Sequence, residues 1–318
     1  MIEATPGEVA RYVADLVGIP VESVRTEALG GGVSNHVVLA ELDGCRMVIK
    51  QALAKLRVKE DWFSDINRIW RESEALLLLA PLLPEGALPE VLFEDRENFL
   101  FAMTAAPSST SWKSELMAGR VSLAVAESIG RIHARMIEAS LDSPELRDTF
   151  GDQTVFDQLR LDPYYRFTAS RHPDLAPLFL SAIDRCGRER RSLVHGDWSP
   201  KNMMVDGDSV MVIDFEVIHF GDPSFDTAFL LNHLLLKSFA MPHLRAELAE
   251  AAARYWSAVS KLAPATIDHL PLLMLARIDG KSPVEYIQDG QMKERVRAFA
   301  RDLIARRPES IAEVFERL

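Results

Sequence analysis

Two short segments constrain this chain more than any other feature: LVHGDWSPKN at residues 193–202 and VIDFE at residues 212–216. Asp197 and Asn202 stand five positions apart in the first segment, and Asp214 ends the hydrophobic run of the second. In magnesium-assisted phosphoryl transfer, an Asp orients the attacking hydroxyl and accepts its proton, while an Asn five positions on and an Asp after the next strand hold the metal. The spacing therefore predicts Asp197 as the catalytic base, with Asn202 and Asp214 as metal ligands.

These segments also carry a family resemblance, together with GDPSFD at residues 221–226. They resemble the aminoglycoside phosphotransferase and choline kinase superfamily of small-molecule kinases. The resemblance implies an α+β, protein-kinase-like two-lobed fold, with a small antiparallel-sheet N-lobe and a mostly helical C-lobe. It implies ATP and Mg²⁺ as cofactors. It also implies that His195 is buried behind the loop in a structural role and that Asp226 braces the loop backbone.

Four short segments narrow the resemblance to 5-methylthioribose kinase. They are KQAL at 50–53, WKSELMAG at 112–119, DFE at 214–216 and RIDG at 277–280. This likeness implies substrate roles for Trp112 and Arg277, although a helix-surface salt bridge is an equal alternative for Arg277. Asn202 departs from those kinases, in which a small hydroxyl residue is expected, so the identity of the acceptor is left open.

Glu216 is the third predicted metal ligand. It follows Asp214 by two positions at a predicted strand end, and alternate residues of a strand face the same side. A role in support of the metal ligands, without direct contact to the metal, is the alternative. The sequence leaves the choice between the two open.

The predicted nucleotide site begins at the glycine run LGGGVSN, residues 29–35, between two predicted strands. Backbone N–H groups of such a run can approach phosphates because no Cβ intervenes. The residues assigned to this part of the site are Gly31, Gly32, Ser34 and Asn35. The family resemblance places a hinge for the adenine ring at Met103 to Ala105.

Lys50 ends a predicted strand, the position from which a protein-kinase-like lysine reaches the nucleotide phosphates while a helix carboxylate steadies it. Glu72 is the first candidate for that carboxylate and Glu74 the second. Residues two apart on a helix face different directions, so only one of them can pair with Lys50.

Hydrophobic periodicity divides the chain into an N-lobe over residues 1–104 and a C-lobe over residues 105–318. Strands are predicted at 24–29, 37–42, 46–50, 90–93 and 98–103, with a hairpin turn at Asp43-Gly44 before the third. Helices are predicted at 7–17, 64–80 with Ser64 or Asp65 as cap, 121–139, 225–239, 242–262, 271–275 and 292–318. The catalytic hairpin is predicted at roughly 192 to 216.

Composition excludes several classes of partner. With 36 basic and 47 acidic side chains the net charge is −11, which argues against nucleic-acid and anionic-membrane surfaces. The apolar runs 76–83 and 229–236 are too short or too interrupted to span a bilayer. Two distant cysteines, Cys45 and Cys186, and an N-terminus unlike a secretory leader predict a cytoplasmic protein.

The predicted substrate is a small molecule bearing a hydroxyl group. Position 196 is Gly where protein kinases have Arg, and the stretch from Asp214 to Asp226 is too short for an activation segment. The leading hypothesis is therefore an ATP- and Mg²⁺-dependent kinase for a pentose-like sugar related to methylthioribose. Choline or ethanolamine kinase and aminoglycoside kinase are alternatives, as is an inactive nucleotide-binding regulator. A homodimer is left open.

Overall fold

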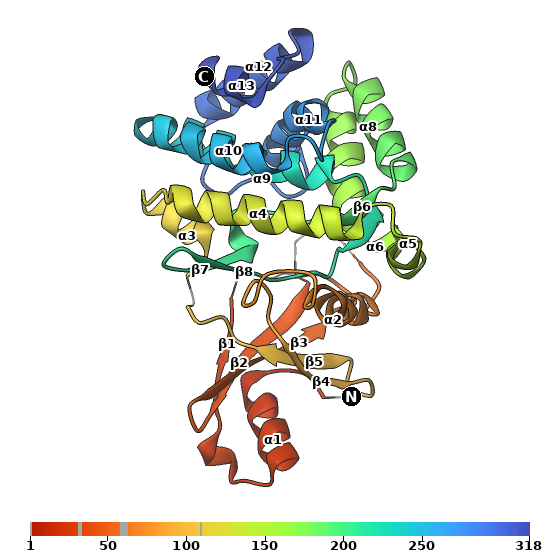
Figure 1. Ribbon diagram of the computed structural model, residues 1–318, viewed down its shortest axis with the longest axis vertical. Helices are drawn as coiled ribbons and strands as arrows, with labels where there is room; N and C mark the ends of the chain where they lie inside the picture. Colours follow the sequence, from red (N-terminus) through yellow and green to blue (C-terminus); the bar gives the residue numbers. More distant parts are fainter. Residues whose placement is uncertain (1, 31–33, 58–62, 109) are drawn as a thin grey trace. The chain divides into compact units, whose positions relative to one another are not determined.

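The computed structural model describes residues 2–30, 34–57, 63–108 and 110–318 (Figure 1). The chain divides into two compact units. Unit 1 consists of Met1–Pro81 and Leu88–Pro107, and unit 2 of Leu82–Ala87 and Ser108–Leu318. An antiparallel sheet forms the centre of unit 1 and helices dominate unit 2, so the predicted α+β class is confirmed.

Unit 1 is built on a five-stranded antiparallel sheet with the strand order β1-β2-β3-β5-β4. The strands are β1 (Arg25–Ala28), β2 (Asn35–Leu42), β3 (Cys45–Ala52), β4 (Val91–Asp95) and β5 (Leu100–Thr104). Asp43 and Gly44 join β2 to β3 with φ angles of 47° and 79°. Two left-handed residues are what a tight hairpin turn of this hand requires, and the predicted turn is confirmed.

Helix α1 (Pro6–Val17) packs on β1 and β2 and supplies part of the unit 1 core. Its buried Val9 and Val13 lie in one hydrophobic cluster with Val38 and Ile49 of the sheet. Thr5 caps the helix by accepting a hydrogen bond from the backbone N–H of Glu8. The 3₁₀ turn η1 (Val21–Ser23) then leads into the sheet.

Helix α2 (Arg68–Leu79) begins later than predicted. Its N-cap is Asn67, which makes no side-chain capping bond, so the assignment of Ser64 or Asp65 as cap was wrong. The Asp65 carboxylate instead accepts the backbone N–H of Asn67 at 2.9 Å. Such a local side-chain bond favours a turn over a helix, which explains the late start.

Unit 2 contains two short antiparallel strand pairs. Strand β6 (Ser192–Val194) pairs with β9 (His219–Gly221), and β7 (Met203–Asp206) pairs with β8 (Ser209–Val212) after the 3₁₀ turn η3 (Pro200–Asn202). The remaining elements are α3 (Trp112–Met117), α4 (Leu123–Ser140), α5 (Pro144–Phe150), α6 (Thr154–Phe156), the π-helix η2 (Asp157–Arg166), α7 (Phe167–Arg171), α8 (Ala176–Arg188), α9 (Ser224–Ala240), η4 (Pro242–Leu244), α10 (Arg245–Val259), α11 (Thr266–Asp279), α12 (Gly290–Ala305) and α13 (Ile311–Glu316).

Helix α9 is the central element of unit 2. Nearly all of its residues are buried, and it packs against both α10 and α11. Helix α4 packs along α10, and the two lie side by side in Figure 1. A helix that is buried nearly all round belongs in the core of a large unit, and α9 follows the predicted catalytic hairpin in the sequence, after β9.

Three predicted helices in unit 2 need correction. Pro271 does not begin a helix but lies inside α11, and the stretch 242–262 starts with the 3₁₀ turn η4. The stretch 292–318 forms two helices rather than one, with a break at 306–310 that contains Pro308. Proline disfavours helical backbone at the preceding residue, which accounts for the break.

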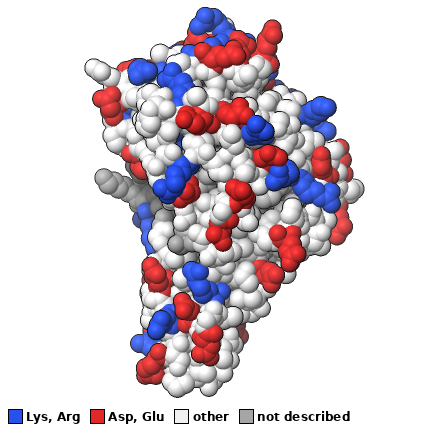
Figure 2. Space-filling model, turned by 60° about the vertical axis from the view of Figure 1, so that its left-hand side comes forward, with Lys and Arg blue, Asp and Glu red and all other residues white. Residues whose placement is uncertain are grey.

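Among the described residues, no helix is both long and apolar enough to cross a membrane. Figure 2 shows acidic and basic side chains interspersed over one face of the molecule, without a continuous patch of either sign.

Replacement of Phe225 by Ala tests the packing at the start of α9. Phe225 is 1% exposed, packs edge-on against Phe156 with centroids 4.9 Å apart and stacks on Phe229 at 5.7 Å. The cavity should lower the free energy of unfolding by about 3–5 kcal/mol, measured by urea titration. Leu180→Ala, at a side chain 54% exposed, should change it by no more than about 0.5 kcal/mol. Equal effects would contradict this account.

Candidate active site

The backbone of the loop after β6 admits only glycine at position 196. Gly196 has a φ of +78°, and a Cβ there would lie 2.6 Å from Val217 Cγ1 and 2.9 Å from the Val217 carbonyl oxygen. Left-handed backbone and the close approach of Val217 both exclude other side chains. The glycine that distinguishes this chain from protein kinases is therefore required by the fold of the loop.

Asp226, in the first turn of α9, holds the same loop from the other side. Its Oδ2 accepts the His195 N–H at 2.6 Å and its Oδ1 accepts the Gly196 N–H at 2.9 Å. Burial raises the pKa of Asp226 to about 7, although the two N–H bonds oppose the rise. The bracing role implied by the family resemblance is thus seen directly.

His195 is fully buried and has its two ring nitrogens engaged. Nδ1 accepts the backbone N–H of Asp197 at 3.1 Å, and Nε2 lies 3.1 Å from the Ile213 carbonyl oxygen. Only the tautomer protonated at Nε2 satisfies both contacts. Burial lowers the pKa of His195 to about 4, so the ring is neutral at physiological pH and fixes the loop rather than exchanging protons.

Asp197 lies at the end of this braced loop, between two cations. Its Oδ2 is 3.0 Å from Arg160 Nη2 and 2.8 Å from Lys201 Nζ. Burial by itself would raise the pKa of Asp197, but the charges of Arg160 and Lys201 outweigh it and lower the pKa. The carboxylate is therefore ionised and oriented, as a group that positions a hydroxyl must be.

Arg160 is a further candidate site residue, which the sequence did not reveal. It lies in the π-helix η2, donates to the Gly196 carbonyl oxygen at 2.6 Å through Nε, and pairs with Asp197 through Nη2. Isolated π-helical turns are frequent at functional sites. In the sequence, nothing in QLRLDPYYR separates Arg160 from surface arginines, so only the tertiary structure could identify it.

The predicted metal ligands surround the same loop. The Asn202 amide nitrogen donates to the Asp197 carbonyl oxygen at 2.9 Å, which fixes the side chain and leaves its oxygen as the ligand atom. Asp214 Oδ2 lies 4.0 Å from Lys201 Nζ. An amide oxygen and a carboxylate are hard donors that suit Mg²⁺, which in nucleotide sites takes few protein ligands and completes its shell with phosphates and water.

The prediction that Asp214 and Glu216 face the same side because they alternate along a strand was wrong. Strand β8 ends at Val212, and Asp214 has a left-handed φ of 72°, so strand alternation does not apply to these residues. The Glu216 side chain is buried, and its charge helps to raise the pKa of Arg160. Among the described residues, no cluster of three or more His, Cys, Asp or Glu side chains forms a metal cage.

In unit 1 the predicted lysine and glutamate form a buried ion pair. Lys50 Nζ lies 2.6 Å from Glu72 Oε2, and the two side chains are 4% and 0% exposed. Glu74 is exposed, so the structure selects Glu72 of the two candidates. A buried pair of this kind fixes the lysine head group at one position on the sheet.

Other predicted nucleotide residues are placed only in part. Gly31 and Gly32 lie outside the described residues. Ser34 and Asn35 are buried, and the Asn35 amide donates to Ser34 Oγ at 3.1 Å. Met103 lies in β5, whereas the Ala105 N–H donates to the Arg46 carbonyl oxygen at 3.3 Å, so Ala105 can offer an adenine ring its carbonyl but not a spare donor.

The two predicted substrate residues differ in environment. Trp112 in α3 is fully buried, and its indole nitrogen has no hydrogen-bond partner among the described residues. Arg277 near the end of α11 donates through Nη1 to Tyr164 Oη at 3.2 Å and to Ser282 Oγ at 2.9 Å. These partners are neutral, so the surface salt bridge considered for Arg277 is not what holds it.

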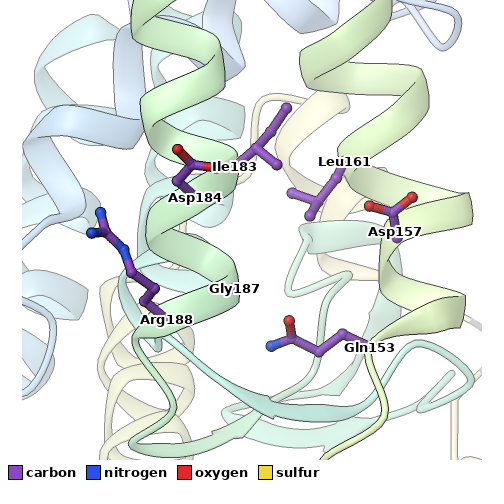
Figure 3. A pocket seen from close by; sticks show the side chains of 7 residues that line it. All are labelled: Gln153, Asp157, Leu161, Ile183, Asp184, Gly187 and Arg188. Carbon is purple, nitrogen blue, oxygen red and sulfur yellow. The ribbon is translucent and has the colours of Figure 1, made fainter.

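A separate pocket lies between α8 and the segment 153–161 (Figure 3). It encloses about 440 Å³ and is lined by Gln153, Asp157, Leu161, Ile183, Asp184, Gly187 and Arg188. None of the predicted site residues lines it. The Asp157 carboxylate already pairs with Arg166 at 2.7 Å, so the catalytic assignment stays with the loop after β6.

Comparison with known proteins identifies the family. The APH phosphotransferase enzyme family matches over residues 25–270. The chain belongs to this family.

Relatives in sequence include methylthioribose kinases. One from Escherichia coli O45:K1 is 27% identical over 255 residues, covering 71% of this chain and 60% of that protein. Methylthioribose kinase 2 of Oryza sativa subsp. japonica is 27% identical over 269 residues, covering 75% and 61%. The chain thus spans about three fifths of the length of these relatives.

Solved structures of other kinases share the fold. An amicoumacin kinase in complex with AMP-PNP and Ca²⁺ matches with a TM-score of 0.60 at 14% identity, over 97% of both chains. A choline/ethanolamine kinase family protein from Mesorhizobium loti matches with a TM-score of 0.54 at 15% identity, also over 97% of both chains. The likeness confirms the predicted kinase-like fold.

Replacement of Asp226 by Asn tests the bracing of the loop. The amide would turn an NH₂ group toward one of the two backbone donors, and one buried N–H would lose its acceptor. The free energy of unfolding should fall by about 1–3 kcal/mol, measured by urea titration. Asp184→Asn, at an exposed carboxylate on α8, should leave it unchanged.

The same variant predicts a pH dependence. The pKa of Asp226 is about 7 in the folded state against 3.8 for the ordinary group, so its stabilising contribution is full below the lower value and is lost as the pH rises through the upper one. The free energy of unfolding of the wild type should therefore fall relative to that of Asp226→Asn as the pH rises from about 4 to about 7. A wild type that gains stability relative to the variant over this range would contradict the burial of Asp226.

Proposed function

We propose that this protein is an ATP- and Mg²⁺-dependent kinase that phosphorylates a hydroxyl group of a small metabolite. The observation that carries the proposal is the arrangement around Asp197: an ionised carboxylate on a braced loop, with Asn202 and Asp214 beside it. These are the groups that phosphoryl transfer to an alcohol requires. The family match and the methylthioribose kinase relatives support the same reaction class.

Asp197 has the role of orienting the acceptor hydroxyl and accepting its proton as the phosphoryl group leaves ATP. Its lowered pKa suits this role, because the transition state is loose and proton removal is late. Arg160 and Lys201 hold the carboxylate in one position. Lys201 is also 46% exposed on its side chain, so it can turn toward the transferred phosphoryl group.

Asn202 and Asp214 are the proposed ligands for Mg²⁺, with Glu216 in support. When bound, the metal neutralises the charge of the nucleotide phosphates and orients the terminal one. Lys50, fixed by Glu72, is the proposed contact to the phosphates from unit 1. Nucleotide binding is therefore assigned to unit 1 and acceptor binding to unit 2.

A pentose-like sugar related to methylthioribose is the proposed acceptor class. Methylthioribose kinases are the relatives found in sequence, and the segments around Trp112 and Arg277 resemble theirs. The presence of Asn202 where a small hydroxyl residue is expected argues that the acceptor differs in detail from methylthioribose.

Replacement of Asp197 by Asn tests the function. The variant keeps the volume of the side chain but cannot accept the proton, so phosphoryl transfer should fall by about 10²–10⁴-fold. ADP formation is measured with a panel of methylthioribose, pentoses, pentose acids and phosphates, choline, homoserine and kanamycin, and ATP binding is measured by calorimetry.

Asp206→Asn is the matched control, since Asp206 is an exposed carboxylate on β7. It should transfer phosphate like the wild type. An Asp197→Asn protein that binds ATP and still turns over at the wild-type rate would refute the assignment. ATP binding by the wild type without transfer to any acceptor would favour the inactive regulator instead.

A further inference from the structure

A group of cationic and polar side chains in unit 2 lies beside α9 and α11. Lys237 lies one turn after His233 on α9, Arg277 is near the end of α11, and Tyr286 follows in the segment 280–289. Lys237 Nζ is 4.8 Å from the centroid of the Tyr286 ring. We refer to Lys237, His233, Arg277 and Tyr286 as the α9–α11 cluster.

Members of the cluster keep polar atoms without protein partners. Lys237 is 0% exposed, yet its Nζ has no hydrogen-bond partner among the described residues. The same holds for the buried Oη of Tyr286 and the buried Nε of Arg277. Buried polar groups are nearly always paired, and an unpaired buried ammonium is particularly costly. Three unpaired donors in one neighbourhood indicate a ligand that accepts hydrogen bonds.

The basic side chains of the cluster have no ion-pair partner in the part of the chain that the structure describes. The neighbouring carboxylate of Glu285 forms an ion pair with Lys113 instead, with Oε1 2.5 Å from Lys113 Nζ. Arg277 Nη1 donates hydrogen bonds to the neutral oxygens of Tyr164 and Ser282. The chain as a whole has a net charge of −11, so this buried group of basic side chains has the opposite sign to the protein's net charge.

Electrostatics within the cluster agree with this geometry. Burial, together with the charges of Lys113 and Arg277, lowers the pKa of Lys237 to about 7, and the charge of Glu285 opposes the shift. The pKa of His233 is lowered well below its usual value by burial and by Lys237, Arg277, Lys201 and Lys113. An anion placed among these groups would relieve their mutual repulsion and restore the charge of Lys237.

The cluster is linked to Asp197 through two side chains. Arg160 pairs with Asp197 at 3.0 Å and also lies over the Tyr164 ring, 5.6 Å from its centroid. The Tyr164 hydroxyl in turn accepts a hydrogen bond from Arg277 at 3.2 Å. Phe229 contacts the rings of both Tyr164 and His233. The cluster is therefore connected to Asp197 by a chain of contacts within unit 2.

We propose that the α9–α11 cluster binds a carboxylate or phosphate group of the acceptor whose hydroxyl is held by Asp197. The inference rests on the proposed kinase function and narrows its acceptor to a hydroxylated small molecule that carries an anionic group. Lys237 and Arg277 supply charge-assisted hydrogen bonds to the oxyanion, and Tyr286 adds a neutral donor. The same cations repel aminoglycosides and choline, which disfavours those acceptors.

Calorimetry with three pentose probes tests the inference: ribose, ribonate and ribose 5-phosphate, at equal ionic strength. Saturating MgADP is present so that the nucleotide's own phosphate site is filled. An anionic probe should bind the wild type about 10-fold or more tighter than ribose does. Preference for ribonate or for ribose 5-phosphate identifies the anion as carboxylate or phosphate.

Lys237→Met is the decisive variant, because it removes the buried amine, which has no hydrogen-bond partner among the described residues, and keeps the length of the side chain. It should lose about 10-fold or more in affinity for the anionic probe and none for ribose. Lys261→Met, at an exposed lysine after α10, should match the wild type. Tyr286→Phe should weaken anion binding by about two- to fivefold.

Two results would overturn the inference: equal binding of ribose and both anions by the wild type, or unchanged anion binding by Lys237→Met. Phosphoryl-transfer assays distinguish failure of the anion site from failure of the proposed kinase activity. Anion binding without transfer to any acceptor would remove the kinase function but leave the anion site. Transfer to neutral sugars with Lys237→Met fully active would leave the kinase and remove the anion site.

Discussion

The geometry of the candidate site depends on one carboxylate, that of Asp226, which accepts the N–H groups of both His195 and Gly196. Two bonds from one rigid group at the start of a buried helix fix the orientation of two successive peptide units. Gly196 can follow this path because it has no Cβ to meet Val217. These contacts fix the position of Asp197, so the core helix α9 determines where the proposed catalytic carboxylate points.

A second constraint is the balance of charge around the loop. Carboxylates at Asp197, Asp214 and Glu216 would repel one another in a buried site. Arg160 and Lys201 offset that repulsion within the protein, and both contact Asp197 directly. The cations keep Asp197 ionised, and the partly exposed Asp214 is left as the carboxylate most accessible to a metal.

Local patterns predicted a large part of this arrangement. The hairpin at Asp43-Gly44 and the identity of the loop residues follow from turn chemistry and from spacing along the chain. The choice of Glu72 over Glu74 did not follow, because it depends on how α2 is rotated against the sheet. Arg160 was missed for a related reason: its partners are far away in sequence, at Gly196 and Asp197, and an arginine in a polar segment gives no sign of burial.

Predictions of helix boundaries were wrong where side chains compete with the backbone for hydrogen bonds or where tertiary packing overrides helix propensity. Asp65 forms a local turn and delays α2, whereas the buried Pro271 lies inside α11, although a proline by itself favours a helix start. The α9–α11 cluster could not be predicted from the sequence either. Lys237 follows an apolar run and has the helical position of an ordinary exposed lysine, and its burial emerges only once α11 and the segment after it are in place.

The most direct test of the central claim follows the phosphoryl group itself. The protein is incubated with ATP labelled with ¹⁸O in the γ-phosphoryl group, Mg²⁺ and a mixture of hydroxylated acceptors, and the products are analysed by mass spectrometry. This account predicts one mole of labelled acceptor ester for each mole of ADP, and none when the divalent metal is chelated. Label that appears only in inorganic phosphate, or in no product while ATP is bound, would contradict it.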